Sequence, residues 1–497
     1  MSLTLSHDAF PGRDRFARRR VLPVLALLAL LYLTALAVGY HINAVVLTIV
    51  LMVTFCLLQI PVAIALIAAA LLGGLHAGLS MDAALSAFND NLLVGAQVGL
   101  TYVMIGALAV ALGRSGLLEL LAQRLSAALD SDTQSTDRRI RVLLFAMLII
   151  ASLLSQNLVP VHIAFIPILI PPLLGLMNRL RLDRRAIACI LACAMSATYL
   201  LLPTGFGAIY LNEILLANVN QVGEPLGLTA TAAMAPKAMA LPVLGIIAGM
   251  LVAVLVTYRR PRGYVSPTSD VPAPDAPEAV TPSPQTQAPV TLNIGQLVMT
   301  MIALGVALWC QIAFDSLLLG ALIGFLIISV TGIFRWREQD DVFTQGLRMM
   351  AQIAVIITVA SGFAGVLSAT GEIAPLVSAA ADLIGDNRAL GAAIMLVVGL
   401  FITIGFGDSF ASVPILAPIY IPLSLALGFS PLATVALLGA SAALGDAGSP
   451  ASTITLGATA GLNADGQHDH IRDSVIPTFL HANVGMLLFA WVAAMVL

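Results

Sequence analysis

Charged side chains are scarce in this sequence. Asp, Glu, Lys and Arg make up 10% of its 497 residues, against about 25% in a soluble domain. Hydrophobic residues make up 59%, and the mean hydropathy is +0.99. So few charges cannot cover a water-facing surface of this size, which excludes a soluble enzyme and a disordered scaffold. The net charge of −3 leaves no basic field for a nucleic acid, so we expect membrane lipid to surround the protein.

Cysteines and catalytic signatures are also lacking. The four cysteines lie in apolar segments without a CxxC pair. Cys189 and Cys193 share a helix face but have no histidine or carboxylate beside them, so small core residues are the expected reading and a metal site is not. The sequence contains neither HExxH nor GxSxG, which argues against an intramembrane enzyme. We expect no cofactor other than a coupling ion.

Long apolar segments fill most of the chain. Residues 44–78 are apolar except at Gln59–Pro61, and 35 residues of helix would reach about 52 Å across a hydrocarbon core of about 30 Å. This segment is therefore predicted to form two short helices with a tight turn between them. Residues 81–93 alternate at helical spacing, as expected of a helix in the membrane interface.

The chain repeats itself across a proline-rich linker. Ala96-Gln97-Val98 recurs as Ala351-Gln352-Ile353, and Gly116 recurs as Gly371 at the same offset. The domains predicted from this repeat are a basic N-terminus (1–20), an extra transmembrane helix (21–43), a first repeat (44–257), a disordered linker (258–293) and a second repeat (294–497).

Each repeat contains one long apolar excursion with a polar centre, at 142–176 and 389–427. We interpret both as re-entrant hairpins, each followed by a broken helix, at 186–217 and 431–461. With the N-terminus inside, all 23 basic residues except Lys237 and Arg388 then lie inside, as the positive-inside rule requires. Two full crossings would give the same sidedness, so the hairpins are inferred from their polar tips. The predicted fold is an all-α polytopic protein of the inner membrane with two inverted repeats.

Four polar breaks interrupt the apolar spans. A freed backbone amide in hydrocarbon is expensive unless it lines a cavity or holds a ligand. Four breaks in symmetric places are therefore predicted to converge at the midplane, where helix ends direct positive dipoles at anions and carbonyls at cations. The breaks are Ser155-Gln156-Asn157, Pro203-Thr204-Gly205-Phe206-Gly207, Gly405-Phe406-Gly407-Asp408-Ser409 and Gly445-Asp446-Ala447-Gly448-Ser449-Pro450.

Two carboxylates within the breaks suggest cation chemistry. Asp408 and Asp446 have neutral counterparts in the first repeat, Asn157 and Tyr199, so the second half is expected to carry the charge. An ionised carboxylate at mid-membrane costs about 2.5–3.5 kcal/mol. Capping of the second hairpin arm is the structural alternative for Asp408 and Asn157.

The oxygen-rich side chains around these acids suit Na⁺ or a proton. The residues expected to bind or couple the cation are Asp408, Asp446, Ser409, Ser449, Asn157 and Ser155. Those expected to line a substrate site are Gln156, Pro203, Thr204, Gly205, Gly207, Gly405, Gly407, Gly445, Gly448 and His162. His162 lies one turn beyond the first tip, where a core histidine and a proton relay are both open readings.

Three stretches resemble the NhaC-type sodium/proton antiporters of the ion transporter superfamily. They read SQNLVPVHIAFIPILIPPLL, GFGDSFASVPILAPIYIPL and GDAGSPASTITLGATAGLN. The sequence is most similar to the YuiF-like branch, whose members are expected to carry amino acids such as histidine. The resemblance implies a scaffold and a transport domain that moves as an elevator, in a homodimer. The tip Asp408-Ser409-Phe410 departs from the SNT tip of related dicarboxylate carriers, which argues against a dicarboxylate.

Na⁺/H⁺ antiport is the function that these residues favour, with Asp408 and Asp446 as the groups for which the two cations compete. The alternative is cation-coupled amino-acid symport, in which an acid holds the amino group and amides near Asn157 or Thr204 hold the carboxylate. Many tip glycines leave room for an organic ligand, which keeps this alternative open. A passive channel is a remote third possibility, because broken helices in inverted repeats suit alternating access better.

Overall fold

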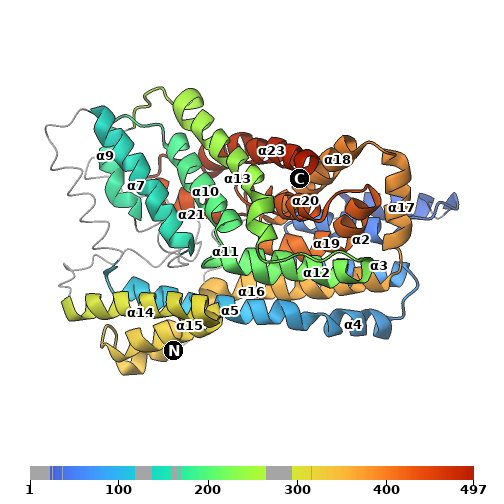
Figure 1. The fold of residues 1–497 in the computed structure, drawn as a ribbon, viewed down its shortest axis with the longest axis horizontal. Coiled ribbons are helices and arrows are strands. Elements are labelled where there is room, and N and C mark those ends of the chain that lie inside the picture. The colour runs from blue at the N-terminus through green and yellow to red at the C-terminus, as the bar shows by residue number, and fades with distance from the viewer. Residues whose placement is uncertain are drawn as a thin grey trace.

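The computed structural model describes residues 23–24, 26–35, 37–117, 137–157, 166, 169–264, 294–314 and 316–497. All regular structure in this part of the chain is helical, and the helices pack into an elongated body (Figure 1). Residues 265–293 of the predicted linker lie outside the described residues. The basic N-terminus and His162 lie outside them as well.

Nine helices among the described residues are long and apolar enough to cross a membrane, as expected for a polytopic membrane protein. They span Leu92–Arg114, Asp137–Asn157, Arg184–Leu201, Met234–Thr257, Ile294–Phe314, Trp336–Ala369, Arg388–Gly405, Ser409–Ala426 and His470–Val496. The extra N-terminal helix is described over Ala26–Ala35.

The first half opens with two short helices and a tight turn, as the sequence predicts. α2 ends at Leu57 and α3 begins at Val62, and Gln59 between them has a positive φ of 64°. The elements of this half are α2 (Ala44–Leu57), α3 (Val62–His76), α4 (Met81–Asp90), α5 (Leu92–Arg114), α7 (Asp137–Asn157), α9 (Leu174–Arg179), α10 (Arg184–Leu201), α11 (Phe206–Ala208), η2 (Ile209–Leu216), α12 (Ala217–Gly223) and α13 (Met234–Val252).

The regular structure of the second half is also helical throughout its described residues. Gly116 and Gly371, related by the sequence repeat, both have a φ of 70° in turns after long helices. The helices of this half are α14 (Ile294–Phe314), α15 (Leu317–Val330), α16 (Gln339–Ala369), α17 (Ile373–Ile384), α18 (Arg388–Phe406), α19 (Ser409–Ala426), α20 (Pro431–Ala443), α21 (Thr453–Leu462), η6 (His470–Val475), α22 (Ile476–Thr478), η7 (Phe479–Asn483) and α23 (Val484–Val496). The opposite membrane orientation of the halves stays a prediction.

Helices α5 and α16, one from each half, touch almost backbone to backbone (Figure 1). A Cβ on Gly106 would lie 2.5 Å from the carbonyl oxygen of Gly346, and one on Gly99 would lie 3.0 Å from that of Ala354. Small residues allow such close approach between helices in lipid, where van der Waals contact holds helices together. This antiparallel helix pair joins the two halves.

The chain is interrupted at the predicted breaks. α18 and α19 are separated only by Gly407 and Asp408, and α20 is separated from α21 by residues 444–452. In the first half α7 ends at Asn157, and the residues after it lie outside the described part of the chain. The first broken helix is longer than the predicted 186–217, because helical structure resumes after residues 202–205 and continues to Gly223.

Candidate functional site

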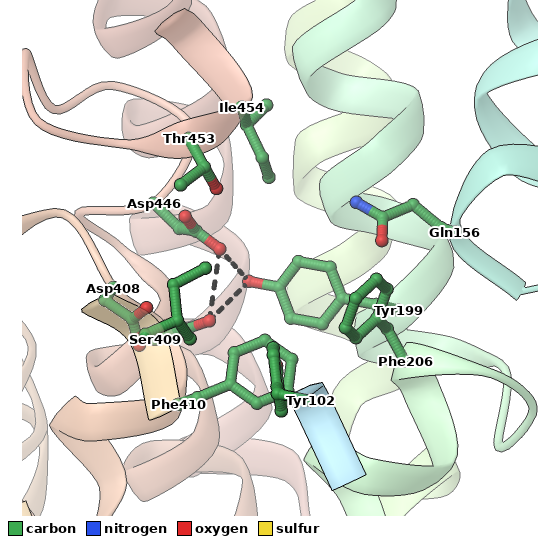
Figure 2. Close-up of a pocket in the computed structure, with 11 residues that line it drawn as sticks. Tyr102, Gln156, Tyr199, Phe206, Asp408, Ser409, Phe410, Asp446, Thr453 and Ile454 are labelled. Carbon is green, nitrogen blue, oxygen red and sulfur yellow. Dashed lines mark hydrogen bonds between the residues drawn. The ribbon is translucent and has the colours of Figure 1, made fainter. Parts of the chain in front are cut away.

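Asp446 lies at the centre of a hydroxyl cluster inside the protein. Its side chain is buried, and its Oδ2 accepts hydrogen bonds from Tyr199 Oη at 2.5 Å and Ser409 Oγ at 3.1 Å. Its Oδ1 accepts a hydrogen bond from Ser452 Oγ at 3.1 Å. Figure 2 shows Tyr199 and Ser409 directed at this carboxylate. Three hydroxyl donors provide the hydrogen bonds that an ionised carboxylate requires.

These groups come from distant parts of the chain. Tyr199 lies in the last turn of α10 in the first half, whereas Ser409 begins α19 and Ser452 is the N-cap of α21. The hydrogen bonds therefore bring the first broken helix, the second hairpin tip and the second broken helix together. Tyr199 Oη and Ser409 Oγ are also 2.9 Å apart, so the hydroxyls contact one another as well as the acid.

Asp408 occupies the second hairpin tip and caps α19. Its Oδ1 accepts a hydrogen bond from Ala411 N at 2.8 Å, which satisfies one free donor of the helix. Gly407 precedes it with a φ of 66°, and a Cβ there would lie 2.6 Å from Ser452 N. Only glycine fits this position without strain. Asp408 also lines the cavity beside Asp446 (Figure 2), so capping does not remove it from the site.

A small cavity beside the two acids is also lined by aromatic residues. The open space is about 30 Å³, enough for one or two water molecules or one small cation. The ring of Phe410 lies 5.3–5.6 Å from the rings of Tyr102, Tyr199 and Tyr210. Of the described residues that line the cavity, none is basic. The arrangement therefore offers negative charge and oxygen atoms to a cation, with rings that keep bulk water away.

The end of α7, at the first hairpin tip, packs against the break at residues 203–207. A Cβ on Gly205, whose φ is 58°, would lie 2.5 Å from the carbonyl oxygen of Asn157. Gln311 on α14 accepts a hydrogen bond from Gly205 N at 3.1 Å. Asn157 is buried, and among the described residues neither of its amide atoms has a hydrogen-bond partner. Gln156 beside it lines the cavity (Figure 2).

Several predicted site residues instead support the backbone. Ser449 Oγ donates to the carbonyl oxygen of Ile404 and Ser155 Oγ to that of Ser152. Gly207, Gly445 and Gly448 permit close helix packing, since a Cβ on any of them would clash with a neighbour. Gly405 has open space around it, Pro203 is exposed, and Thr204 is half-buried in the turn before Gly205. The structure does not place these residues in the cavity.

The sequence reasoning missed Ser452, which contacts the acid, and several residues that line the cavity, among them Tyr102, Phe410 and Thr453. Ser452 carried a usable signal, because it follows Pro450 in the polar break and precedes an apolar helix, as an N-cap does. Tyr102 carried none, since it lies within an unbroken span, and its role follows only from the packing of α5 against the breaks.

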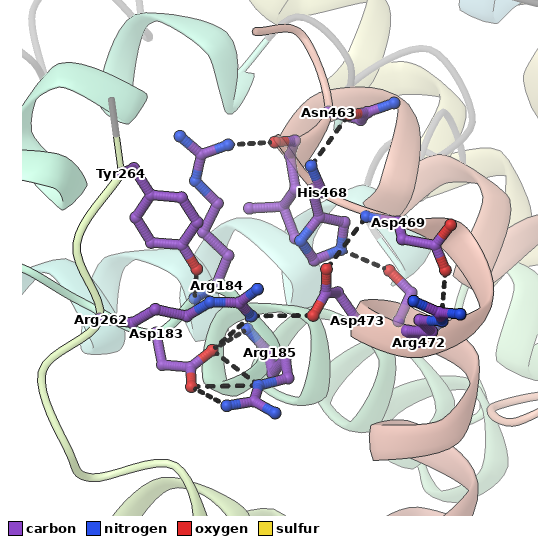
Figure 3. A network of polar contacts seen from close by, with 12 residues as sticks. Asp183, Arg184, Arg185, Arg262, Tyr264, Asn463, His468, Asp469, Arg472 and Asp473 are labelled. Atoms are coloured by element: carbon purple, nitrogen blue, oxygen red, sulfur yellow. Dashed lines mark hydrogen bonds and ion pairs between the residues drawn. The ribbon is translucent and has the colours of Figure 1, made fainter. Parts of the chain in front are cut away.

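A second polar network lies at the arginine-rich end of the helices (Figure 3). Arg184 is fully buried and forms a two-pronged ion pair with Asp465, at 2.6 Å and 2.5 Å. Its guanidinium lies 4.1 Å from the ring centre of Tyr264, whose hydroxyl accepts a hydrogen bond from Arg184 N at 3.0 Å. Arg262 pairs with Asp473 at 2.8 Å. The network fastens the start of the linker to both halves.

We expect Arg184→Met to destabilise the protein by about 3–5 kcal/mol, because it leaves the largely buried Asp465 without its counter-ion. Thermal unfolding in detergent measures the effect. Arg114→Met is the matched control: its pair with Glu338 is exposed on both sides, at 33% and 38%, and an exposed pair contributes about 0–1 kcal/mol. Equal melting temperatures for the two variants would contradict this account.

His468 in the same network makes stability depend on pH. Burial lowers its pKa from 6.5 to about 4, so the unfolded chain binds more protons than the folded one between these values. Stability should therefore fall as the pH drops from 6.5 towards 4, by about 3 kcal/mol over the window. We expect the melting temperature of His468→Gln to change less with pH over this window than that of the parent. An unchanged slope would show that other groups cause the loss.

Comparison with known proteins adds the family. The sequence model of the Na⁺/H⁺ antiporter family matches residues 190–491, and a second model, also described as a Na⁺-H⁺ antiporter family, matches residues 43–129. An "Uncharacterized membrane protein" of Haemophilus influenzae is 44% identical over 92% of this chain and 99% of its own length. The "Putative amino acid transporter YuiF" of Bacillus subtilis is 42% identical over 92% of this chain and 100% of its own.

Two solved transporters share the fold. The YdaH transporter of Alcanivorax borkumensis superposes with a TM-score of 0.56 at 18% identity, over 90% of this chain and 97% of that one. MtrF of Neisseria gonorrhoeae, from a class of antimetabolite efflux pumps, gives a TM-score of 0.51 at 14% identity, over 83% and 84%. The all-helical membrane fold and the resemblance to NhaC-type and YuiF-like proteins are thereby confirmed. Because the first family model covers more than half of the chain, this integral multi-pass membrane protein belongs to the Na⁺/H⁺ antiporter family of secondary transporters.

Proposed function

We propose that the protein exchanges Na⁺ for H⁺ and that Asp446 binds both ions in turn. The observation that carries this proposal is the buried Asp446 carboxylate, which accepts hydrogen bonds from three hydroxyls and has no basic residue among the described cavity lining. A buried carboxylate without a counter-ion needs a cation or a proton. Both ions meet that need at the same oxygens, so they exclude each other.

The ligand set around Asp446 suits a hard monovalent cation. Carboxylate and hydroxyl oxygens are the ligands that such ions prefer. Asp446, Ser409 and Ser452 would supply the first oxygens, with Asp408 across the cavity. When Na⁺ enters, a hydroxyl can turn its proton away and offer a lone pair. When a proton binds instead, the acid is neutral and holds the cation weakly.

Competition at one acid couples the two fluxes. A bare carboxylate crossing the membrane centre costs about 2.5–3.5 kcal/mol, whereas the sodium-loaded or protonated form is neutral. The loaded site should therefore change sides far more readily than the empty one. An elevator movement in each subunit of a homodimer would carry the site from one side of the membrane to the other. In this arrangement the two repeats are inverted, and the N-terminus lies on the inner side of the inner membrane. These features remain part of the proposal.

Amino-acid transport is the second candidate, favoured by the 42% identity to YuiF over nearly the whole chain. In that case Asp408 or Asp446 would hold the amino group, and the unpaired Asn157 amide would face the carboxylate. A cavity of about 30 Å³ has no room for an amino acid, so this function requires the aromatic cluster to open. The cavity size therefore favours the ion exchanger.

Proteoliposomes with a pH-sensitive dye inside test the proposal. We expect an imposed Na⁺ gradient alone to move protons in the opposite direction, with saturation in Na⁺. Proton movement that depends on added histidine or another amino acid would favour symport instead. Unsaturated ion current without proton countermovement would favour a channel. Liposomes with choline in place of Na⁺ are the control for leak.

A further inference from the structure

A second cavity lies between α5, α12, α16 and α19, which pack together in the lower half of Figure 1. Its open space is about 40 Å³, and none of the described residues that line it is charged. Gln221 and Ser368 at its edge are exposed, whereas Pro414 and Pro418 are buried. The cavity is thus a polar, uncharged recess that opens at the surface of the protein.

The second cavity lies on one defined side of the first. From Tyr102 at the acid site to Asn91 at the second cavity is about 16 Å along α5, and from Ile353 to Ser361 is about 12 Å along α16. Along both helices, the direction from the acid site to the second cavity leads away from the end that carries an arginine, which is Arg114 in α5 and Arg348 in α16. The positive-inside rule makes this the outer side, so the recess lies between the outer surface and Asp446.

Four polar side chains of the recess each use a donor on a backbone carbonyl. Asn91 Nδ2 donates to the carbonyl oxygen of Ala87, and Asn218 Nδ2 donates to that of Ile214. Ser361 and Ser368 donate to carbonyl oxygens four residues earlier in α16. The amide oxygens of Asn91 and Asn218 and the hydroxyl lone pairs of the two serines are therefore open to a cation, beside the second N–H of each amide and the side chain of Gln221.

The prolines of α19 free backbone oxygens beside the recess. Proline has no N–H, so Pro418 leaves the carbonyl of Pro414 without its helical donor, and Pro414 does the same for Phe410. Phe410 lines the acid cavity, whereas Pro414 and Pro418 line the recess. Freed carbonyls spaced four residues apart share one helix face. Both freed carbonyls therefore lie on the stretch of α19 between the acid cavity and the recess.

We propose that this recess is a second binding site for a monovalent cation, through which Na⁺ reaches Asp446 from the outside. The inference rests on the proposed Na⁺/H⁺ exchange and adds a site to it. Uncharged oxygens replace only part of the hydration shell of Na⁺, so the recess binds the ion more weakly than a carboxylate does. The recess therefore releases Na⁺ inward to Asp446. The absence of acid among the described lining residues keeps it from trapping the ion or the proton.

Two substitutions test the site in full-length protein. Pro418→Ala returns an N–H to the carbonyl of Pro414, and Asn218→Leu removes an amide oxygen. Each should raise the KM for external Na⁺ about 3- to 10-fold and leave the rate at saturating Na⁺ near the parent value. Pro418→Ala should at the same time preserve or raise the melting temperature, because it regularises the helix. Pro242→Ala, in α13 and away from both cavities, is the matched control with unchanged KM.

Equilibrium binding of ²²Na⁺ to purified protein, with choline chloride holding ionic strength constant, separates the two proposals. Asp446→Asn should retain a weak component of Na⁺ binding that the added Asn218→Leu change removes. Loss of all Na⁺ binding in Asp446→Asn, or an unchanged KM in both recess variants, would reduce the recess to a water-filled vestibule. Unaltered transport in Asp446→Asn would instead overturn the proposed exchange mechanism, and parent protein that binds no Na⁺ would overturn both.

Discussion

Asp446→Asn should abolish Na⁺-driven proton movement. An amide takes no proton at working pH and gives the cation no charge, so we expect exchange to fall at least about 100-fold, to the level of empty liposomes. The variant should fold, because the amide can still hydrogen-bond with Tyr199 and Ser452. The measurement is the rate of internal pH change after a Na⁺ jump.

Tyr199→Phe is the matched control for this substitution. It removes one hydrogen bond to Asp446 but keeps the ring contact with Phe410 and the charge of the acid. We expect exchange to continue, with its pH dependence displaced towards higher pH, because the carboxylate loses a donor that favours its ionised form. Equal and complete loss in both variants would show that packing, and not the charge of Asp446, limits transport.

The second large effect concerns Asp408. Asparagine caps helices as well as aspartate does, so Asp408→Asn should keep the bond from Ala411 N while it removes the second negative charge of the cavity. We expect Na⁺-coupled flux to be lost and the melting temperature to stay within about 2 °C of the parent, since a retained cap implies a stability change of a few tenths of a kcal/mol.

Asp408→Ala separates the cap from the charge. This variant loses both, and cap removal costs about 1 kcal/mol, so it should be less stable than Asp408→Asn and equally inactive. Full activity in Asp408→Asn together with low activity in Asp408→Ala would assign Asp408 to capping alone. That result would leave Asp446 as the only acid of the exchange mechanism.

The positions of the breaks could be read from the sequence because polar, glycine-rich stretches are rare within apolar spans. The turn at Gln59 and the interruption at Gly407–Asp408 follow from this signal alone. Gly116 and Gly371, which recur at the same offset in the sequence, have the same φ of 70°. Such features depend on local sequence, where backbone freedom and helix length decide the outcome.

The exact contacts of Asp446 could not be read in the same way. Ser449 and Ser452 both follow the acid in one break, and only the path of the chain after Pro450 decides which hydroxyl reaches it. Tyr199 was recognised as the neutral counterpart of Asp446, but nothing local says that its hydroxyl would bond to that acid. Such contacts depend on how helices from different halves cross, which side-chain patterns do not encode.

Two hydrogen-bond partners of Asp446, Tyr199 and Ser409, precede it in the order of synthesis. The ribosome adds residue 199 and residue 409 before residue 446, so two of the three hydroxyl donors have already been made when the acid emerges. A nascent chain that stops after the first half contains neither acid of the site. Asp446 thus enters the membrane after two of its hydroxyl partners, which can meet the carboxylate as soon as it is inserted.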